Sequence, residues 1–277
     1  MANAQPAIAL PRATPAVPGV AKLLTKVGRA FTRSYVILLV LAVWEVLPRT
    51  GFVEAAFLPP LSEVLKSGWS LLASGELFQH VKASLSRSLI GFLLSIVSGV
   101  PLGLLMGWYK GVANTLSPLL EALRNTAALA LLPVFILLLG IGETSKIALI
   151  VYASSWPILL NTVSGVRNVD PLLIKSAKTM GLSSAQLFRK VILPASVPTI
   201  FVGVRLAGAT SLVVLVAAEM IGAKAGLGYL IIYAQYNFQI AHMYFGILTI
   251  TVIGVVFNGL LQQVERHFTA WKPAPGE

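Results

Sequence analysis

The chain contains no cysteine, which excludes disulfides, cysteine metal sites and thiol nucleophiles but does not identify a compartment. Charge is also scarce, because Asp, Glu, Lys and Arg make up 11% of the 277 residues, against about 25% in soluble globular domains. The three histidines, His80, His242 and His267, are too scattered to indicate a metal site. An ordinary soluble domain with a charged surface is therefore excluded.

A nucleotide site is not indicated either. The stretch "GIGETSKI" holds glycines and a lysine, but Ser145 stands where a P-loop needs glycine, and no Ser or Thr follows Lys146. No Ser-His-Asp grouping can be assigned. The sequence therefore predicts no catalytic residues, and the chain is not expected to be an enzyme.

Long apolar runs are abundant: 56% of the residues are hydrophobic and the mean hydropathy is +0.83. The runs are continuous rather than alternating, which is typical of membrane helices and not of barrel strands. Runs near 18 residues or longer can cross a bilayer core of about 30 Å. We predict an all-α membrane protein with about six spans, at residues 35–50, 88–108, 115–140, 145–165, 194–218 and 243–262.

The first 33 residues are basic and precede the apolar stretch "SYVILLVLAVWEVL". This tail is long for a signal peptide and no convincing cleavage site follows, so an uncleaved first span is favoured. The stretch between the first two spans has helical periodicity but is too polar to cross, so we expect it along the membrane surface or beside the bundle. The expected domains are a cytoplasmic tail (1–33), the first span with surface helices (34–87), a core (88–266) and a C-terminal cytoplasmic tail (267–277).

The net charge of +11 indicates membrane topology and a lipid environment rather than nucleic acid. With both termini inside, thirteen of the 21 Lys and Arg residues are cytoplasmic, six are outside and two lie within spans. Cytoplasmic loops carry the excess of Lys and Arg, so both termini are predicted to be cytoplasmic.

Small residues recur every fourth position in the second span, at Ser95, Gly99, Gly103 and Gly107. Such a face lets two helices approach closely in lipid. We favour a contact between helices of one subunit over a dimer contact.

A polar, basic segment, "KSAKTMGLSSAQLFRKVILP", interrupts the apolar chain. Upstream, Asp170 and Pro171 predict a helix start, because Asp caps backbone N–H groups and Pro suits the first helical position. Gly181 can end this helix in the left-handed conformation. Ser183 and Gln186 have capping-box spacing and predict a second short helix.

The second helix carries an apolar stripe of Leu187, Phe188 and Val191, and Pro194 is expected to mark the boundary with the next span. An exposed stripe on a cytoplasmic loop indicates a protein partner. The alternative is a stripe lying on the membrane interface.

The segment resembles the loop of ABC importer permeases with the pattern E-A-A, three residues, Gly, nine residues, I-x-L-P. The spacing is kept, with Lys175 in place of the acidic residue and Ser176 in place of an alanine. The charge at the first position of the pattern is therefore reversed. The matching positions are Ala177, Gly181, Leu193 and Pro194, and Val191 is conservative for Ile.

Further stretches, including "FLPPLSEVL", "PVFILLLGIGETSKIALI" and "AEMIGAKAGLGYLI", resemble the nitrate, sulfonate and taurine group of these permeases over roughly residues 58–266. The resemblance implies a type I importer permease in the bacterial inner membrane. It implies that the loop 168–193 docks on a cytoplasmic ABC ATPase dimer that binds ATP and Mg, so this chain needs no cofactor of its own. A second copy of the permease and a periplasmic or lipid-anchored binding protein complete the implied assembly. The residues implied to couple to the ATPase are Lys175, Ser176, Ala177, Gly181, Leu187, Phe188 and Pro194.

Four charged residues fall within spans or at their edges: Glu121, Arg124, Arg205 and Glu219. A charged side chain within the bilayer costs free energy, so such residues usually face the interior of a helix bundle or a water-filled path. In the structural interpretation Glu121 and Arg124 pair locally on one helix face. Arg205 then interacts with a backbone carbonyl or with a partner helix. In the functional interpretation the four line the path of a small anion, with Arg205 attracting it.

The favoured function is therefore the permease subunit of an ATP-driven importer for a sulfonate-, taurine- or nitrate-like anion. A secondary transporter would need midplane ion-coupling groups and usually repeated halves, and no clear repeat is visible. A membrane scaffold that transports nothing is the other alternative.

Overall fold

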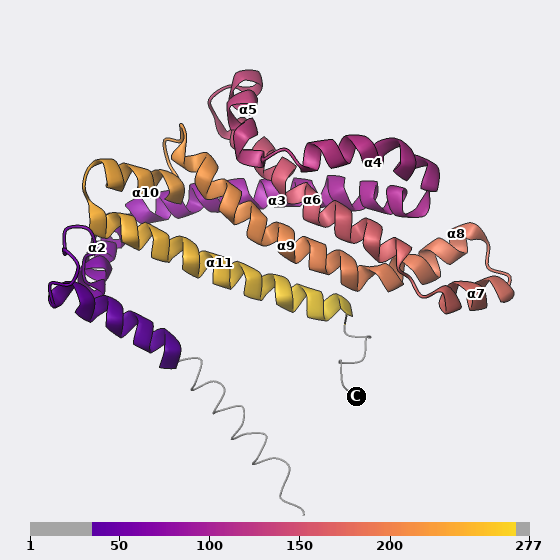
Figure 1. The fold of residues 1–277 in the computed structure, drawn as a ribbon, viewed down its shortest axis with the longest axis horizontal. Helices are drawn as coiled ribbons and strands as arrows, with labels where there is room; N and C mark the ends of the chain where they lie inside the picture. Colours follow the sequence, from indigo (N-terminus) through magenta and orange to yellow (C-terminus); the bar gives the residue numbers. More distant parts are fainter. Residues whose placement is uncertain (1–34, 270–277) are drawn as a thin grey trace, which may run out of the picture. The chain divides into compact units, whose positions relative to one another are not determined.

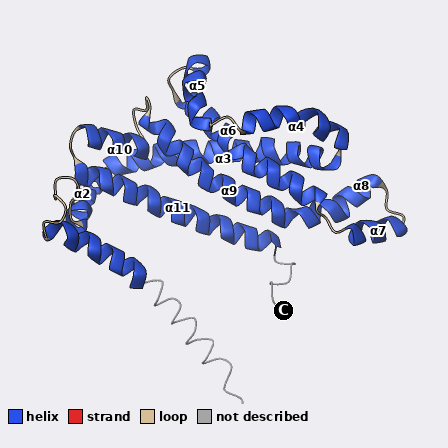
Figure 2. Cartoon of the chain, viewed as in Figure 1, coloured by secondary structure: helices blue, strands red, loops and turns tan. Residues whose placement is uncertain are grey.

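The computed structural model describes residues 35–269, and within that range every regular element is helical (Figures 1 and 2). The predicted tail 1–33 and residues 270–277 of the predicted C-terminal tail lie outside the described residues. The chain divides into two compact units, residues 1–62 and 63–277.

In the first unit, residues 35–49 form a helix that coincides with the predicted first span. The indole Nε1 of Trp44 donates to the carbonyl of Pro59 at 3.1 Å. The carboxylate of Glu45 accepts from the backbone N–H and from the hydroxyl of Ser62, both at 2.9 Å. These contacts fold the following residues back onto the helix.

The second unit contains the remaining helices. In chain order they are α2 (Leu61–Ala73), α3 (Glu76–Trp108), α4 (Lys110–Arg124), a 3₁₀ turn (Ala128–Leu131), α5 (Leu132–Leu139), α6 (Glu143–Arg167), α7 (Pro171–Thr179), α8 (Ser184–Leu187), a π-helical turn (Phe188–Ile192), α9 (Leu193–Met220), α10 (Leu227–Tyr236) and α11 (Ile240–Thr269). α2 begins at the end of the first unit and packs in the second, where a Cβ at Gly68 would collide with the ring of Phe245 of α11.

Four helices among residues 35–269 are long and apolar enough to cross a membrane: α3, α6, the continuous helix Ser184–Met220, and α11. The predicted span at 115–140 is not one continuous helix, because α4 and the segment Ala128–Leu139 are bent by 86°. Ala127 is extended (φ −61°, ψ 120°) and Pro133 lies in the first turn of α5, so the helix cannot run through. Counting the bent pair as one span gives five.

The helix that holds the second predicted span is longer than that span, since α3 begins at Glu76 rather than at residue 88. The expected boundary between residues 87 and 88 therefore lies inside a helix. The polar residues that argued against a span, His80, Ser84 and Arg87, are buried on one face and have polar partners there. Sequence hydropathy cannot anticipate such partners.

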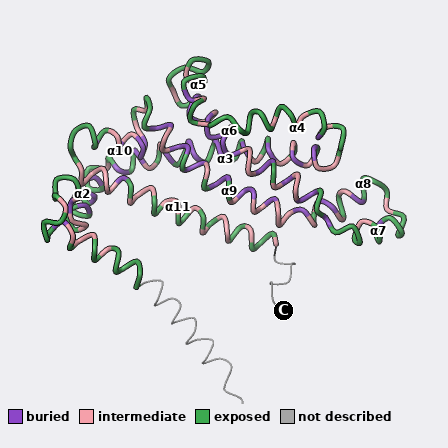
Figure 3. Tube along the Cα trace, in the orientation of Figure 1, coloured by how far each residue is buried: buried purple, intermediate pink, exposed green. Residues whose placement is uncertain are grey.

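The core of the second unit lies between α3, α6 and α9, where the buried residues concentrate (Figure 3). The small residues of α3 face α6: a Cβ at Gly99 would lie 3.0 Å from Ile158 Cγ2, and one at Gly103 would lie 2.6 Å from Thr162 Cβ. This confirms the favoured contact within one subunit. α11 runs beside α9 but has a single buried residue, Gly246, so most of its surface is open to lipid or to another chain (Figure 1).

Candidate functional site

The loop 168–193 folds as its capping residues predict. Asp170 accepts from the backbone N–H of Leu172 at 2.8 Å and starts α7. Gly181 has φ +77°, the left-handed conformation expected at the elbow. Ser183 and Gln186 form the predicted capping box, with the Ser183 N–H donating to Gln186 Oε1 at 3.0 Å. We call residues 168–193 the coupling loop.

The apolar stripe of the second helix is not exposed as predicted. Leu187 is 5% exposed and packs with Val166, Ala177 and Ile192, while the ring of Phe188 lies 5.2 Å from that of Trp108. The stripe turns inward because the ends of α3 and α6 offer it apolar partners. The expectation that Leu187 faces a partner protein is therefore corrected, and Ala177 is buried as well, whereas Phe188 is half-buried.

The exposed apolar residues of the coupling loop belong instead to α7 and the elbow. Leu172 is 68% exposed and Met180 is 77% exposed. Lys175 and Ser176 are exposed beside them, as is Gly181. The exposed surface of α7 and the elbow therefore combines apolar side chains with the basic Lys175 and Lys178.

The helix after the elbow does not stop at Pro194. It continues from Ser184 to Met220, with the π-helical turn Phe188–Ile192 directly before Leu193 and Pro194. Pro cannot donate the regular helical hydrogen bond, and a wider turn accommodates its ring without ending the helix. The last part of the coupling loop, from Ser184 on, is therefore the beginning of the long helix.

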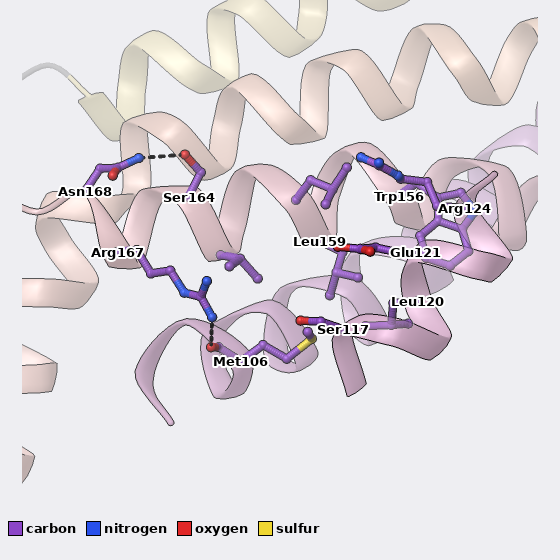
Figure 4. Close-up of a pocket in the computed structure, with 12 residues that line it drawn as sticks. Met106, Ser117, Leu120, Glu121, Arg124, Trp156, Leu159, Ser164, Arg167 and Asn168 are labelled. Atoms are coloured by element: carbon purple, nitrogen blue, oxygen red, sulfur yellow. Dashed lines mark hydrogen bonds between the residues drawn. The ribbon is translucent and has the colours of Figure 1, made fainter. Parts of the chain in front are cut away.

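A cavity of about 310 Å³ lies between the C-terminal half of α6, α4 and the end of α3. Figure 4 shows Arg167 and Asn168 toward one end, and Glu121, Arg124 and Trp156 toward the other. The two arginines and one glutamate leave a formal charge of +1 on the lining.

Polar groups in this cavity are only partly paired with other side chains within residues 35–269. Arg167 donates to the carbonyl of Met106 at 3.3 Å, which orients its guanidinium. The predicted local pair of Glu121 and Arg124 is wrong, because no ion pair joins them in the part of the chain that the structure describes. The buried Nε1 of Trp156 likewise has no hydrogen-bond partner among the described residues.

Arg205 is paired with α11: its Nη1 lies 3.1 Å from Oε2 of Glu265. A partner helix was one of the structural alternatives for this arginine. The pair is partly solvated, with the Arg205 side chain 37% exposed.

Glu219 is fully buried and lies in a polar cluster at the opposite end of α9 from the coupling loop. Its carboxylate accepts from Ser84 Oγ at 2.8 Å, from Arg87 Nη1 at 2.6 Å and from the backbone N–H of Gly228 at 2.9 Å. Arg87 also donates from Nη2 to Glu143 at 2.7 Å.

Nearby, Lys146 and His80 bind backbone groups, with Lys146 Nζ donating to Gly142 O at 3.0 Å and His80 Nδ1 accepting from the Gly226 N–H at 3.1 Å. The cluster therefore joins α3, α6 and the turn between α9 and α10.

Of the four charged residues singled out in the sequence, the structure brings only Glu121 and Arg124 into one cavity. Arg87 and Glu143 were missed, because 132 and 76 positions separate them from Glu219. The sequence feature that could have indicated a buried site at Glu219 is the glycine-rich stretch "GAKAGLG" that follows it.

Residues 99–270 match the family model described as binding-protein-dependent transport system inner membrane component. The chain belongs to this family. It is 38% identical over 229 residues to a probable ABC transporter permease of Brucella abortus, which covers 83% of this chain and 90% of the relative.

Two further relatives carry more specific names. A putative aliphatic sulfonates transport permease of Bacillus subtilis is 36% identical, with 84% of each chain covered. The taurine transport system permease of Escherichia coli is 34% identical, covering 83% of this chain and 86% of the relative.

Among solved structures, an inward-facing MetNI methionine ABC transporter matches with a TM-score of 0.63 at 19% identity, covering 70% of this chain and 96% of that one. This likeness confirms the type I importer permease fold. The chain is an ABC importer permease, an inner membrane component.

Proposed function

We propose that this permease passes a small organic or inorganic anion of the sulfonate, taurine or nitrate type. The observation that carries the proposal is the cavity lined by Arg124, Arg167 and Glu121, whose formal charge is +1. Guanidinium groups suit sulfonate and carboxylate oxygens, because they donate several hydrogen bonds in one plane. The named relatives of this chain include aliphatic sulfonate, taurine and nitrate permeases, which supports the same solute class.

The path residues of the proposal are Glu121 and Arg124 at the cavity. Arg205 and Glu219 support the path less directly, because each is engaged by a partner side chain on another helix. Their proposed role is to hold α9 in position beside the path.

The assembly is proposed to contain a second copy of this chain, a cytoplasmic ABC ATPase dimer that binds ATP and Mg, and an external binding protein that delivers the anion. α7 and the elbow meet the ATPase through Leu172, Lys175, Ser176 and Met180. The buried Leu187 packs against the end of α6 and the Phe188 ring lies beside Trp108 at the end of α3, so that a displacement of α7 reaches the membrane helices. Both termini are then cytoplasmic, as the Lys and Arg distribution favours.

The test is uptake of labelled taurine, an alkanesulfonate and nitrate into proteoliposomes that contain the permease, its ATPase and the binding protein. We expect Arg124→Gln to lower uptake of the transported anion at least tenfold, while assembly and basal ATP hydrolysis persist. Lys82→Gln is the control, since Lys82 is exposed on α3 and does not line the cavity.

Two outcomes would contradict the proposal. Uptake driven by an ion gradient without the ATPase would indicate a secondary transporter. A complex that binds the ATPase but moves none of these anions, nor any solute presented by the binding protein, would indicate a scaffold.

A further inference from the structure

A groove of about 740 Å³ lies between the last two turns of α3 and the start of the long helix Ser184–Met220. Its floor is apolar, with Pro101, Leu104 and Leu105 on one side and Phe188 on the other. Trp108 and Tyr109 line it where α3 ends.

The charge on the groove has one sign. Arg189 is its only charged lining residue, and this arginine makes no ion pair within residues 35–269. Lys110 and Lys190 follow Tyr109 and Arg189 directly in sequence, and both are exposed. The groove thus has an apolar body with a basic rim.

The depth of the groove follows from the length of α3. About 20 helical residues cross a hydrocarbon core, and α3 becomes continuously apolar only after Arg87 and Ser88. Leu104 and Leu105 therefore lie within the hydrocarbon, while Trp108 and Tyr109 fall where aromatic residues gather at a membrane interface. The groove floor is therefore at the depth of lipid acyl chains.

We propose that this groove binds an anionic phospholipid. One acyl chain lies along Pro101, Leu104, Leu105 and Phe188, and the phosphate accepts hydrogen bonds from Arg189 at the level of Trp108. Basic pockets between membrane helices on the cytoplasmic side recognise anionic headgroups in this way. A lipid in this position would contact the junction between the coupling loop and the long helix. It would therefore help to stabilise the position of that junction.

The experiment is native mass spectrometry of the full-length permease with its ATPase, released from detergent micelles. The micelles contain equal amounts of phosphatidylglycerol and phosphatidylcholine with the same acyl chains. The wild-type protein is expected to retain phosphatidylglycerol over phosphatidylcholine. Arg189→Gln should lower phosphatidylglycerol retention about fivefold, as expected for one basic residue near an anionic surface, and Arg189→Lys should restore most of it.

A second variant tests the apolar half of the site. Leu105→Trp fills the groove and should reduce retention of both lipids. Free glycerol phosphate, which has the headgroup charge without chains, should not compete. Arg266→Gln is the matched control, because Arg266 is exposed at the end of α11 and does not line the groove.

Three results would overturn the proposal. The first is equal phosphatidylglycerol retention by the wild type and by both groove variants. The second is an equal loss in Arg266→Gln, which would indicate general attraction to a basic surface. The third is a lower phosphatidylglycerol retention by the permease with its ATPase than by the permease alone, which would make the groove a protein contact.

Discussion

Arg87 Nη1 lies 2.6 Å from Glu219 Oε1 although 132 positions separate the two residues, and neither side chain is more than 5% exposed. Removing one member of a buried pair leaves an uncompensated charge, which costs about 3–5 kcal/mol. We therefore expect Arg87→Leu and Glu219→Leu each to lower the unfolding temperature strongly in detergent micelles. Arg49→Gln removes a partly exposed pair with Glu45 and should cost under about 1 kcal/mol. Equal effects of the buried and exposed substitutions would contradict this account.

Gly226 closes the turn over Glu219. It has φ +132°, and a Cβ there would collide with the Glu219 carboxylate. Gly226→Ala should therefore destabilise the protein, because it combines strain at positive φ with a clash against a fixed group. Gly111→Ala is the control, since Gly111 lies within α4 with open space around it and should be neutral or slightly stabilising. The measurement is the unfolding temperature of the two variants beside the wild type.

Leu172 and Leu187 lie in the same loop but have opposite exposure, 68% and 5%. Leu172→Asp should weaken association with the ATPase while leaving the unfolding temperature of the permease unchanged. Leu187→Ala should instead cost about 2–5 kcal/mol of stability. Co-purification of the ATPase, measured with the unfolding temperature, separates the two roles. If instead Leu187→Ala weakens ATPase association and Leu172→Asp lowers the unfolding temperature, then Leu187 rather than Leu172 contacts the ATPase.

Gly181 adopts φ +77° with nothing within 4 Å of a would-be Cβ, so its requirement is conformational rather than steric. A β-branched residue there costs about 1–3 kcal/mol of strain. We expect Gly181→Val to assemble with the ATPase but to lose substrate-stimulated ATP hydrolysis. Gly181→Asn should retain it, because Asn tolerates the left-handed region. Full stimulation in the valine variant would show that the elbow does not transmit motion.

Arg205 and Glu265 join α9 to α11 at 3.1 Å in a partly solvated position. The coupling energy of such a pair is expected to stay below about 1 kcal/mol. Arg205→Gln and Glu265→Gln should each lower stability slightly and non-additively in a double-mutant cycle, with anion uptake nearly unchanged. If uptake falls sharply in Arg205→Gln and not in Glu265→Gln, Arg205 serves the anion directly.

Local patterns in the sequence were sufficient for the membrane class, the helical content and the local fold of residues 168–193. The cap at Asp170, the elbow at Gly181 and the capping box of Ser183 were predictable, because each depends on hydrogen bonds or backbone angles within a few residues. The small residues of α3 also predicted a close helix contact, since their spacing alone places them on one face.

Tertiary structure determined the features that depend on contacts between residues far apart in sequence. It turned Leu187 inward against Val166, started α3 twelve residues before the predicted span, and bent the chain after Arg124. It also enclosed Glu219 with Arg87 and Glu143. In each case the deciding partner sits on another helix, and the free energy of burying an apolar or charged side chain depends on that partner, which no local pattern contains.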